Sequence, residues 1–150
     1  MMKLPRALLL MSAAACCSAP AFAALGGDAS SVESDRAAVQ GVLQVTPFLE
    51  YDMHVIRTAA GTVIHEYVSP QGKVFAVTWH GAGRPDLGQL LGSYSAKLAQ
   101  AAPRTHYDHH HLRIATADVV LESDFHLRAH SGRAWVPALL PQSFASDNIE

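Results

Sequence analysis

Residues 62–79 read TVIHEYV-SPQG-KVFAVTW, two runs of β-branched and aromatic residues joined by a short polar stretch. Such runs are typical of β-strands, and the apolar residues within them recur with a period of two. Ser69-Pro70-Gln71-Gly72 places proline second and glycine fourth, which favours a type I turn. A turn this short joins antiparallel neighbours, so residues 62–79 predict a β-hairpin.

A third strand precedes this hairpin. Residues Tyr51–Arg57 have the same composition and period, and only the short connection 59–61 separates them from the hairpin. Three consecutive strands with short connections predict a three-stranded antiparallel meander between residues 51 and 79.

Helices are predicted on both sides of the meander. After Pro85 and Asp86, a proline and an acidic residue suited to a helix start, five apolar residues recur at helical spacing: Leu87, Leu90, Leu91, Tyr94 and Leu98. This stripe predicts one amphipathic helix that packs on the sheet and ends before Pro103. A shorter helix is predicted from about Ser31 to Gln40, at an edge of the sheet.

The C-terminal third predicts further strands. Leu112–Ala115 and Val119–Ser123 have strand composition, and Ala134–Val136 is predicted as a short edge strand before Pro137. The predicted fold class is therefore α+β: a small antiparallel sheet of roughly five strands, with one amphipathic helix packed on it and a short N-terminal helix. The order of the strands after Pro103 is left open by the sequence.

The N-terminus predicts a secretory signal peptide. Lys3 and Arg6 precede an apolar run of about ten residues, and Ala21-Phe22-Ala23 forms a cleavage site. The apolar run is shorter than the ~20 residues that a membrane-spanning helix needs. We therefore expect cleavage after Ala23, a periplasmic or secreted location, and a single domain over residues 24–150 without a transmembrane segment.

The two cysteines fall within this leader. A lipid anchor on Cys16 or Cys17 is disfavoured, because Ala13 stands where a lipoprotein signal usually has leucine and a conventional cleavage site follows. Cleavage after Ala23 leaves a cysteine-free domain, which excludes a disulfide, a thiol nucleophile and a cysteine-built zinc site.

Charge argues against nucleic acid as a partner. Loss of Lys3 and Arg6 with the leader leaves nine basic and 13 acidic residues, a net charge of −4 with the histidines neutral. A mildly acidic domain without a basic run is poorly suited to nucleic acid or to an anionic membrane surface.

Histidines offer the main candidate site. His106, Asp108, His109, His110 and His111 lie within six residues, and on a strand His109 and His111 would share one face. Imidazole and carboxylate ligands suit zinc, copper or nickel, and His126 and His130 would complete the site if their segment lies alongside. The alternatives are a solvated polar loop and a pH-responsive segment.

Glu66 is a second candidate, because it lies in mid-strand between Ile64 and Val68. Burial would raise the pKa of its carboxyl group and suit it to acid–base chemistry. The commoner arrangement is a structural pair with an arginine, for which Arg57, Arg113 and Arg133 are available.

Several short motifs resemble a family of exported proteobacterial proteins known as domain of unknown function 2844. The most specific block is Glu66–Pro70 with Gly72, Val74–Val77, Trp79 and Gly81. The others are Leu25–Gly27; Pro85–Leu87 with Gly92 and Tyr94; and Gly132–Ala134 with Pro137 and Leu139–Pro141. The resemblance covers nearly all of the chain after the leader. It implies an exported single domain and carries over no activity, ligand or functional residue.

No catalytic or cofactor motif is present: the chain has no Gly-x-Ser-x-Gly elbow, no phosphate-binding loop and no His-Glu-x-x-His. The sequence therefore favours a non-catalytic protein that binds a protein or a component of the cell envelope. The alternative is a periplasmic metal-binding protein that uses the segment His106–His111, and a small hydrolase has only composition in its support.

Overall fold

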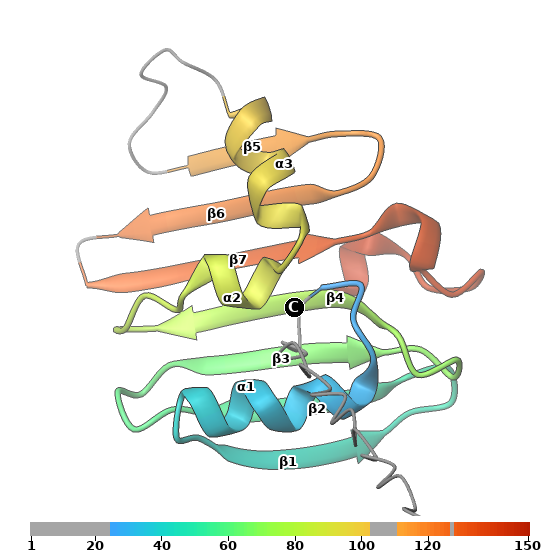
Figure 1. The fold of residues 1–150 in the computed structure, drawn as a ribbon, viewed down its shortest axis with the longest axis horizontal. Helices are drawn as coiled ribbons and strands as arrows, with labels where there is room; N and C mark the ends of the chain where they lie inside the picture. The colour runs from blue at the N-terminus through green and yellow to red at the C-terminus, as the bar shows by residue number, and fades with distance from the viewer. Residues whose placement is uncertain (1–24, 103–110, 127) are drawn as a thin grey trace, which may run out of the picture.

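The computed structural model describes residues 25–102, 111–126 and 128–150 (Figure 1). These residues form one sheet of seven antiparallel strands in the order β1-β2-β3-β4-β7-β6-β5. The strands are β1 (Val42–Pro47), β2 (Asp52–Arg57), β3 (Val63–Val68), β4 (Val74–Gly81), β5 (His111–Ala115), β6 (Val120–His126) and β7 (Ala129–Trp135).

The helices are short. A 3-10 turn, η1 (Ala29–Ser31), runs into α1 (Val32–Ala38), and α2 (Leu87–Leu91) is followed by α3 (Tyr94–Ala101). Two further 3-10 turns, η2 (Pro137–Leu139) and η3 (Ser146–Asn148), lie in the C-terminal segment. Within the described residues no helix is both long and apolar enough to cross a membrane.

The meander predicted from residues 51–79 is confirmed. It forms β2, β3 and β4, and the turn at Pro70 closes with a bond of 2.8 Å from the Gly72 amide to the Ser69 carbonyl. Gly72 has a φ of +74°, in the region that favours glycine.

The predicted helix after Pro85 is two helices. Gly92 adopts a φ of +51° and ends α2, and α3 begins two residues later in a new direction. The apolar stripe still serves one purpose, because Leu90, Leu91 and Leu98 are all buried in the same core. Spacing alone does not reveal the break, since both helices present their leucines to the sheet.

The sequence-based prediction missed one strand and misplaced another. Residues 42–47, for which no element was predicted, form β1, and Ala134–Val136, predicted as a short edge strand, belongs largely to the central strand β7, between β4 and β6. Ala134 is fully buried there. The glycine and polar residues of β7 conceal its position, because a central strand usually reads as more apolar.

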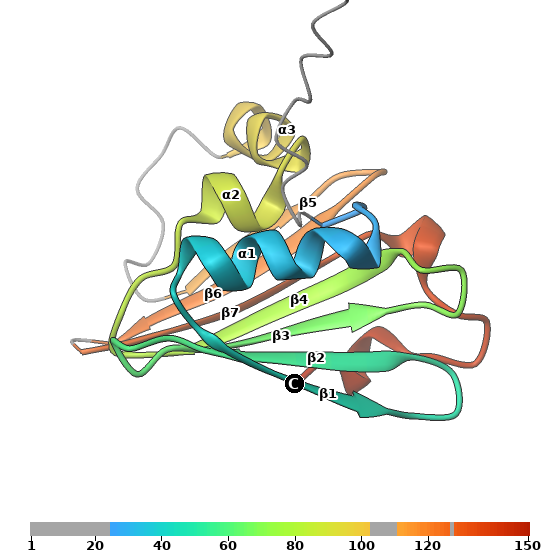
Figure 2. The same ribbon diagram turned by 60° about the horizontal axis from the view of Figure 1, so that its bottom comes forward.

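All three α-helices cover one face of the sheet, as Figure 2 shows, and the C-terminal segment crosses the other face. Helix α1, predicted at an edge of the sheet, lies over the half that includes the edge strand β1 together with β2 and β3 (Figures 1 and 2). We call the two sides the helix face and the open face.

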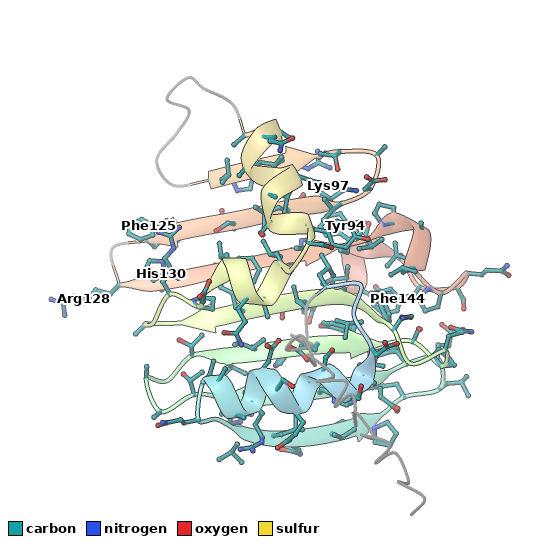
Figure 3. All side chains as sticks on the ribbon, viewed as in Figure 1. Tyr94, Lys97, Phe125, Arg128, His130 and Phe144 are labelled. Atoms are coloured by element: carbon teal, nitrogen blue, oxygen red, sulfur yellow. The ribbon has the colours of Figure 1, made fainter. Side chains whose placement is uncertain are left out.

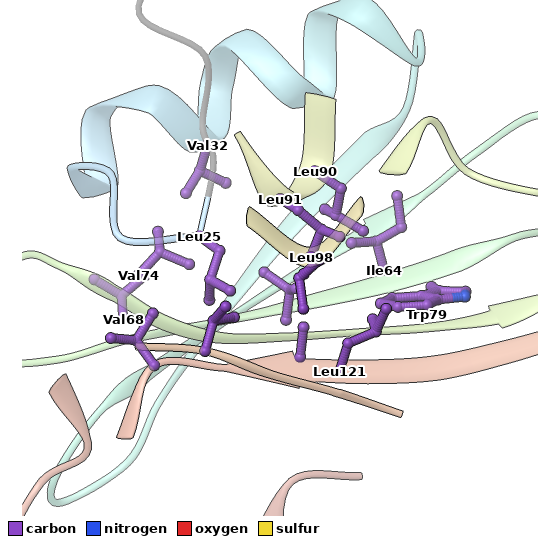
Figure 4. Packing of buried hydrophobic residues seen from close by; sticks show 14 of the residues in the cluster. Leu25, Val32, Ile64, Val68, Val74, Trp79, Leu90, Leu91, Leu98 and Leu121 are labelled. Carbon is purple, nitrogen blue, oxygen red and sulfur yellow. The ribbon is translucent and has the colours of Figure 1, made fainter. Parts of the chain in front are cut away.

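The main core lies between the helices and the helix face (Figure 4). Trp79 contributes the largest side chain and is 3% exposed. Its indole ring occupies the space above Gly132 of the neighbouring strand β7, where an added Cβ atom would lie 2.2 Å from Cζ2 of Trp79. Because Gly132 has no side chain, it leaves the space that the ring of Trp79 occupies.

A second, aromatic core lies on the open face under the C-terminal segment. Phe144 from this segment (labelled in Figure 3) packs against three rings of the sheet side: Tyr51, Tyr67 and Phe75. The ring centroids are 5.1–6.1 Å apart, in edge-to-face geometry. This contact fixes the path of the chain end across the sheet.

Candidate functional site

The open face carries two rows of polar side chains that run across the strands. The first row contains His65, Thr78, Arg133, Glu122 and Arg113, each opposite the next in the strand register. The second contains His80, Ser131, Asp124 and His111. Both rows follow from alternation, because residues two apart on a strand share a face.

Glu122 is the centre of the first row. Its Oε2 accepts a bond of 2.7 Å from Nε of Arg133, and its Oε1 lies 2.9 Å from Nε of Arg113. The guanidinium group of Arg133 also lies 5.4 Å from the ring centroid of Trp135. Two cations therefore hold one carboxylate, and the three charged side chains form a fixed platform.

In the second row, Nδ1 of His111 lies 2.6 Å from Oδ1 of Asp124. The strand register sets this contact, because His111 on β5 is directly opposite Asp124 on β6. The carboxylate orients the imidazole ring and leaves Nε2 as the nitrogen outside this contact. Metal-binding histidines are commonly held in this way.

The C-terminal segment borders the polar rows. The backbone oxygen of Glu150 accepts from the hydroxyl of Tyr67 at 2.7 Å and from that of Thr78 at 3.1 Å, and lies 3.2 Å from Nδ1 of His65. Nη1 of Arg133 donates to the carbonyl of Ile149 at 3.2 Å. The open face thus already binds the main-chain oxygens of Ile149 and Glu150.

These groups surround a hollow of about 550 Å³ on the open face. We call it the polar hollow. Its lining comes from five strands and the C-terminal segment, and its polar side chains are His65, Thr78, His80, His111, Glu122, Asp124, Ser131, Arg133 and Glu150. Its size is in the range of small-molecule sites. Its lining offers hydrogen-bond donors, hydrogen-bond acceptors, and both positively and negatively charged groups.

Glu66 lies elsewhere, on the helix face, where it is fully buried beneath α1. Burial, and next the charge of Asp35 on α1, raise the pKa of Glu66 to about 9. Burial likewise raises the pKa of Asp35, whose Oδ1 accepts a bond of 2.7 Å from Gln89. The predicted arginine partner is wrong, because Arg133 and Arg113 pair with Glu122 on the opposite face.

The buried carboxyl groups of Glu66 and Asp35 adjoin each other, and the charge of Asp35 helps to raise the pKa of Glu66. Neither oxygen of Glu66, nor Oδ2 of Asp35, has a hydrogen-bond donor among the described residues, although the two carboxyl groups are neighbours. A protonated Glu66 donating to ionised Asp35 satisfies this contact. Because Glu66 is enclosed in the core on the helix face, neither carboxyl group of the pair lines the polar hollow.

Only part of the predicted metal site lies within the described residues. His106, Asp108, His109 and His110 lie outside the described residues, whereas His111 begins β5. In the part of the chain that the structure describes, no three histidine, cysteine or acidic side chains are grouped to hold a metal ion. The four-residue set His106, Asp108, His109 and His111 therefore stays a prediction.

The two more distant histidines separate. His126 is on the same side of the sheet as Asp124, two residues along β6, so it lies on the open face beside the row that contains His111 and not in it. His130 alternates to the other side, where its ring lies 4.6 Å from that of Phe125 (Figure 3). Sequence reasoning missed Asp124 and Glu122 because their roles depend on the register of β5, β6 and β7.

A comparison with protein families identifies the chain. Residues 21–149 match the model of the family described as "Protein of unknown function (DUF2844)". The chain belongs to this family. No curated protein and no solved structure matches it.

Membership of the DUF2844 family confirms the resemblance, and the fold gives several of the motif residues a structural role. Gly132 accommodates Trp79, and Gly26 leaves room for Tyr94, whose Cε2 would lie 2.9 Å from an added Cβ atom. Pro137 and Leu139 belong to η2, at the start of the C-terminal segment. These motif residues build the core and position the segment, whereas most side chains of the polar hollow lie outside the motifs.

Proposed function

We propose that this domain is a non-catalytic, exported protein that binds a polar component of the cell envelope, or a polar segment of another envelope protein, in the polar hollow. One observation carries the proposal: the hollow of about 550 Å³ is lined by charged groups that ion pairs already hold in place. Fixed groups lose little conformational entropy when a ligand arrives, which favours binding.

The lining indicates a ligand with both donors and acceptors. Arg133 and the histidines can bind carboxylates and amide oxygens of a ligand, and Glu122 and Asp124 can bind its amines and hydroxyls. Peptide and saccharide fragments of a bacterial cell wall combine all of these groups. The signal-peptide prediction for residues 1–23 supports this choice, because cleavage after Ala23 would deliver the domain to the compartment that contains them.

His80 provides the test, because it lines the hollow and is exposed, so its removal spares the core. We expect purified protein to bind solubilised cell-wall fragments in a calorimetric titration, and His80→Ala to weaken binding about tenfold, the effect of one lost hydrogen bond. Gln100→Ala, on α3 of the opposite face, is the control and should bind as the unmodified protein does. Absence of binding, or equal affinity for His80→Ala, would contradict the proposal.

A second function, divalent-metal binding through the segment His106–His111, is favoured by the contact between His111 and Asp124. We expect zinc, copper or nickel to raise the midpoint of thermal unfolding of chelator-treated protein. At a hundredfold excess over the dissociation constant the gain is about 2.7 kcal/mol.

Two variants distinguish a specific site from adventitious binding. Replacing both His109 and His111 by alanine should abolish the shift, and Asp124→Asn should weaken metal affinity by roughly 10–100-fold through the orientation of His111. Asp118→Asn is the matched control, because that carboxylate pairs with Lys97 instead. No shift with any of the three metals would refute this second function.

A further inference from the structure

Strand β1 is an open edge of the sheet. Among the described residues it pairs with β2 alone, and Figure 1 shows it at the border of the sheet. Residues 42–49 carry no charge and contain four of the six large hydrophobic side chains that are exposed in the described part of the chain: Val42 at 72%, Val45 at 49%, Phe48 at 46% and Leu49 at 99%. Edge strands of monomeric proteins are usually protected by charges, and β1 has none.

The opposite edge shows the contrast. Strand β5 carries His111, which contacts Asp124 of β6, and Arg113, which forms an ion pair with Glu122 of β6, and α3 lies against the strand. Charged side chains and a covering helix are two common means of preventing edge-to-edge pairing. The two edges of this sheet therefore differ in charge and in cover, two features that affect whether another strand can add.

The hydrogen-bonding groups of β1 alternate in direction. The amide of Phe48 donates to Tyr51 across the hairpin, so Thr46, Gln44 and Val42 also point their groups toward β2. Leu43 and Val45 consequently direct both N–H and C=O outward. Pro47 faces outward as well, where its missing N–H costs nothing, as is usual for proline in an edge strand.

We propose that a second copy of this chain pairs with β1 in antiparallel orientation, placing Leu43 opposite Val45 of the second copy and Gln44 opposite Gln44 of the second copy. In this register Leu43 and Val45 exchange both of their outward bonds with each other across a two-fold axis. All outward N–H donors of β1 are then satisfied. The result is a continuous sheet formed by two chains.

The side chains are complementary in the same register. On the helix face, Leu43 meets Val45 of the second copy, and the two-fold axis repeats this apolar pair. On the open face, Val42 meets Thr46 of the second copy, and the two Gln44 amides face each other and can bond. An uncharged strand is suited to pairing with itself, because no like charges are brought together.

This interface is separate from the proposed function. The polar hollow is lined by β3, β4, β5, β6, β7 and the C-terminal segment, and no residue of β1 contributes to it. Pairing through β1 would therefore leave both hollows of the dimer accessible, and either proposal can fail without the other.

Cysteine crosslinking tests the register directly. In full-length protein with Cys16→Ser and Cys17→Ser, Gln44→Cys places two thiols in a non-hydrogen-bonded pair, where Cα atoms are about 4.5 Å apart and a disulfide can form. We expect a disulfide-linked dimer under mild oxidation. Thr46→Cys is the matched control: it is on the same strand and face, but the two cysteines would be roughly 14 Å apart along the strand and should stay reduced.

Sedimentation equilibrium tests the interface without a crosslink. We expect the protein to sediment as a dimer, and Val45→Pro to sediment as a folded monomer, because this change removes only an outward N–H. Val45→Thr, which keeps the N–H, should remain dimeric. A monomeric protein in which Gln44→Cys does not crosslink would overturn the proposal, as would a dimer that survives Val45→Pro or an extended peptide of another protein bound at β1 in place of the second copy.

Discussion

Replacing Gly132 by alanine is expected to destabilise the protein by about 3 kcal/mol, the upper part of the range for an overpacked core. The new Cβ atom would lie 2.2 Å from Cζ2 and 2.7 Å from Cε2 of Trp79, and 2.8 Å from the carbonyl oxygen of Glu122. Trp79 is 3% exposed and enclosed by the helices, so its ring cannot move aside without opening a void elsewhere. Urea unfolding followed by tryptophan fluorescence measures the change.

Two comparisons separate this clash from the general effect of losing a glycine. Gly72→Ala introduces a side chain at a φ of +74° with no atom within 4 Å, so it should cost only about 1 kcal/mol of backbone strain. Trp79→Val removes the ring that the alanine would strike, so the double variant should lose less stability than the sum of the single changes. Additive losses would show that Trp79 does not lie on Gly132.

Glu66→Gln is expected to stabilise the protein by about 3 kcal/mol at pH 8 and to have little effect near pH 4.5. The carboxyl group of Glu66 titrates near 4.5 when unfolded and about 9 when folded, because burial and the charge of Asp35 disfavour its ionisation. Between these values the folded chain binds a proton that the unfolded chain has released. The free energy of unfolding contributed by Glu66 therefore falls as the pH rises from about 4.5 to about 9.

The amide of glutamine removes this dependence, since its NH₂ group can donate to Asp35 at every pH. The measurement is the free energy of unfolding of both proteins across pH 4.5–9, in which the two curves should diverge as the pH increases. Glu33→Gln serves as the control: this exposed carboxylate is on α1, as Asp35 is, and pairs with Arg36, which lowers its pKa, so its loss should not reproduce the divergence. Parallel curves for the wild type and Glu66→Gln would contradict the raised pKa of Glu66 in the folded protein.

The meander was predictable because its information is local. The alternation of apolar residues between positions 51 and 79, together with the turn Ser69–Gly72, determines three strands and their order without reference to the rest of the chain. The break at Gly92 was not predictable from the leucine pattern, because α2 and α3 both direct leucines to the same core.

The position of β7 required tertiary information. Its sequence, with His130, Ser131 and Gly132, reads as a polar edge, yet the strand is central because Trp79 fills the space that Gly132 leaves and Arg133 binds Glu122. Strand β1 was missed for another reason. Val42–Pro47 pairs on one side only, and its largely exposed side chains do not alternate regularly between buried and exposed positions.

The candidate site was predictable only in its residue types. The sequence singled out His111 from a local run of histidines, whereas its partner Asp124 is 13 positions away and is brought opposite by the register of β5 and β6. Glu66 was singled out as a mid-strand carboxyl with an arginine as the expected partner, but its neighbour is Asp35 of α1, which packs on the helix face. In both cases the chemistry of one side chain was visible in the sequence and its partner was not.

A backbone amide NMR titration tests ligand binding in the polar hollow most directly. Purified protein is titrated with solubilised cell-wall fragments, and the shifted resonances are placed on the sheet. We predict that the shifts concentrate at Thr78, His80, Asp124, Ser131 and Arg133, which line the hollow on three neighbouring strands. Shifts confined to the helix face, or no shifts at saturating concentrations of fragments, would contradict the assignment of the open face as the binding site.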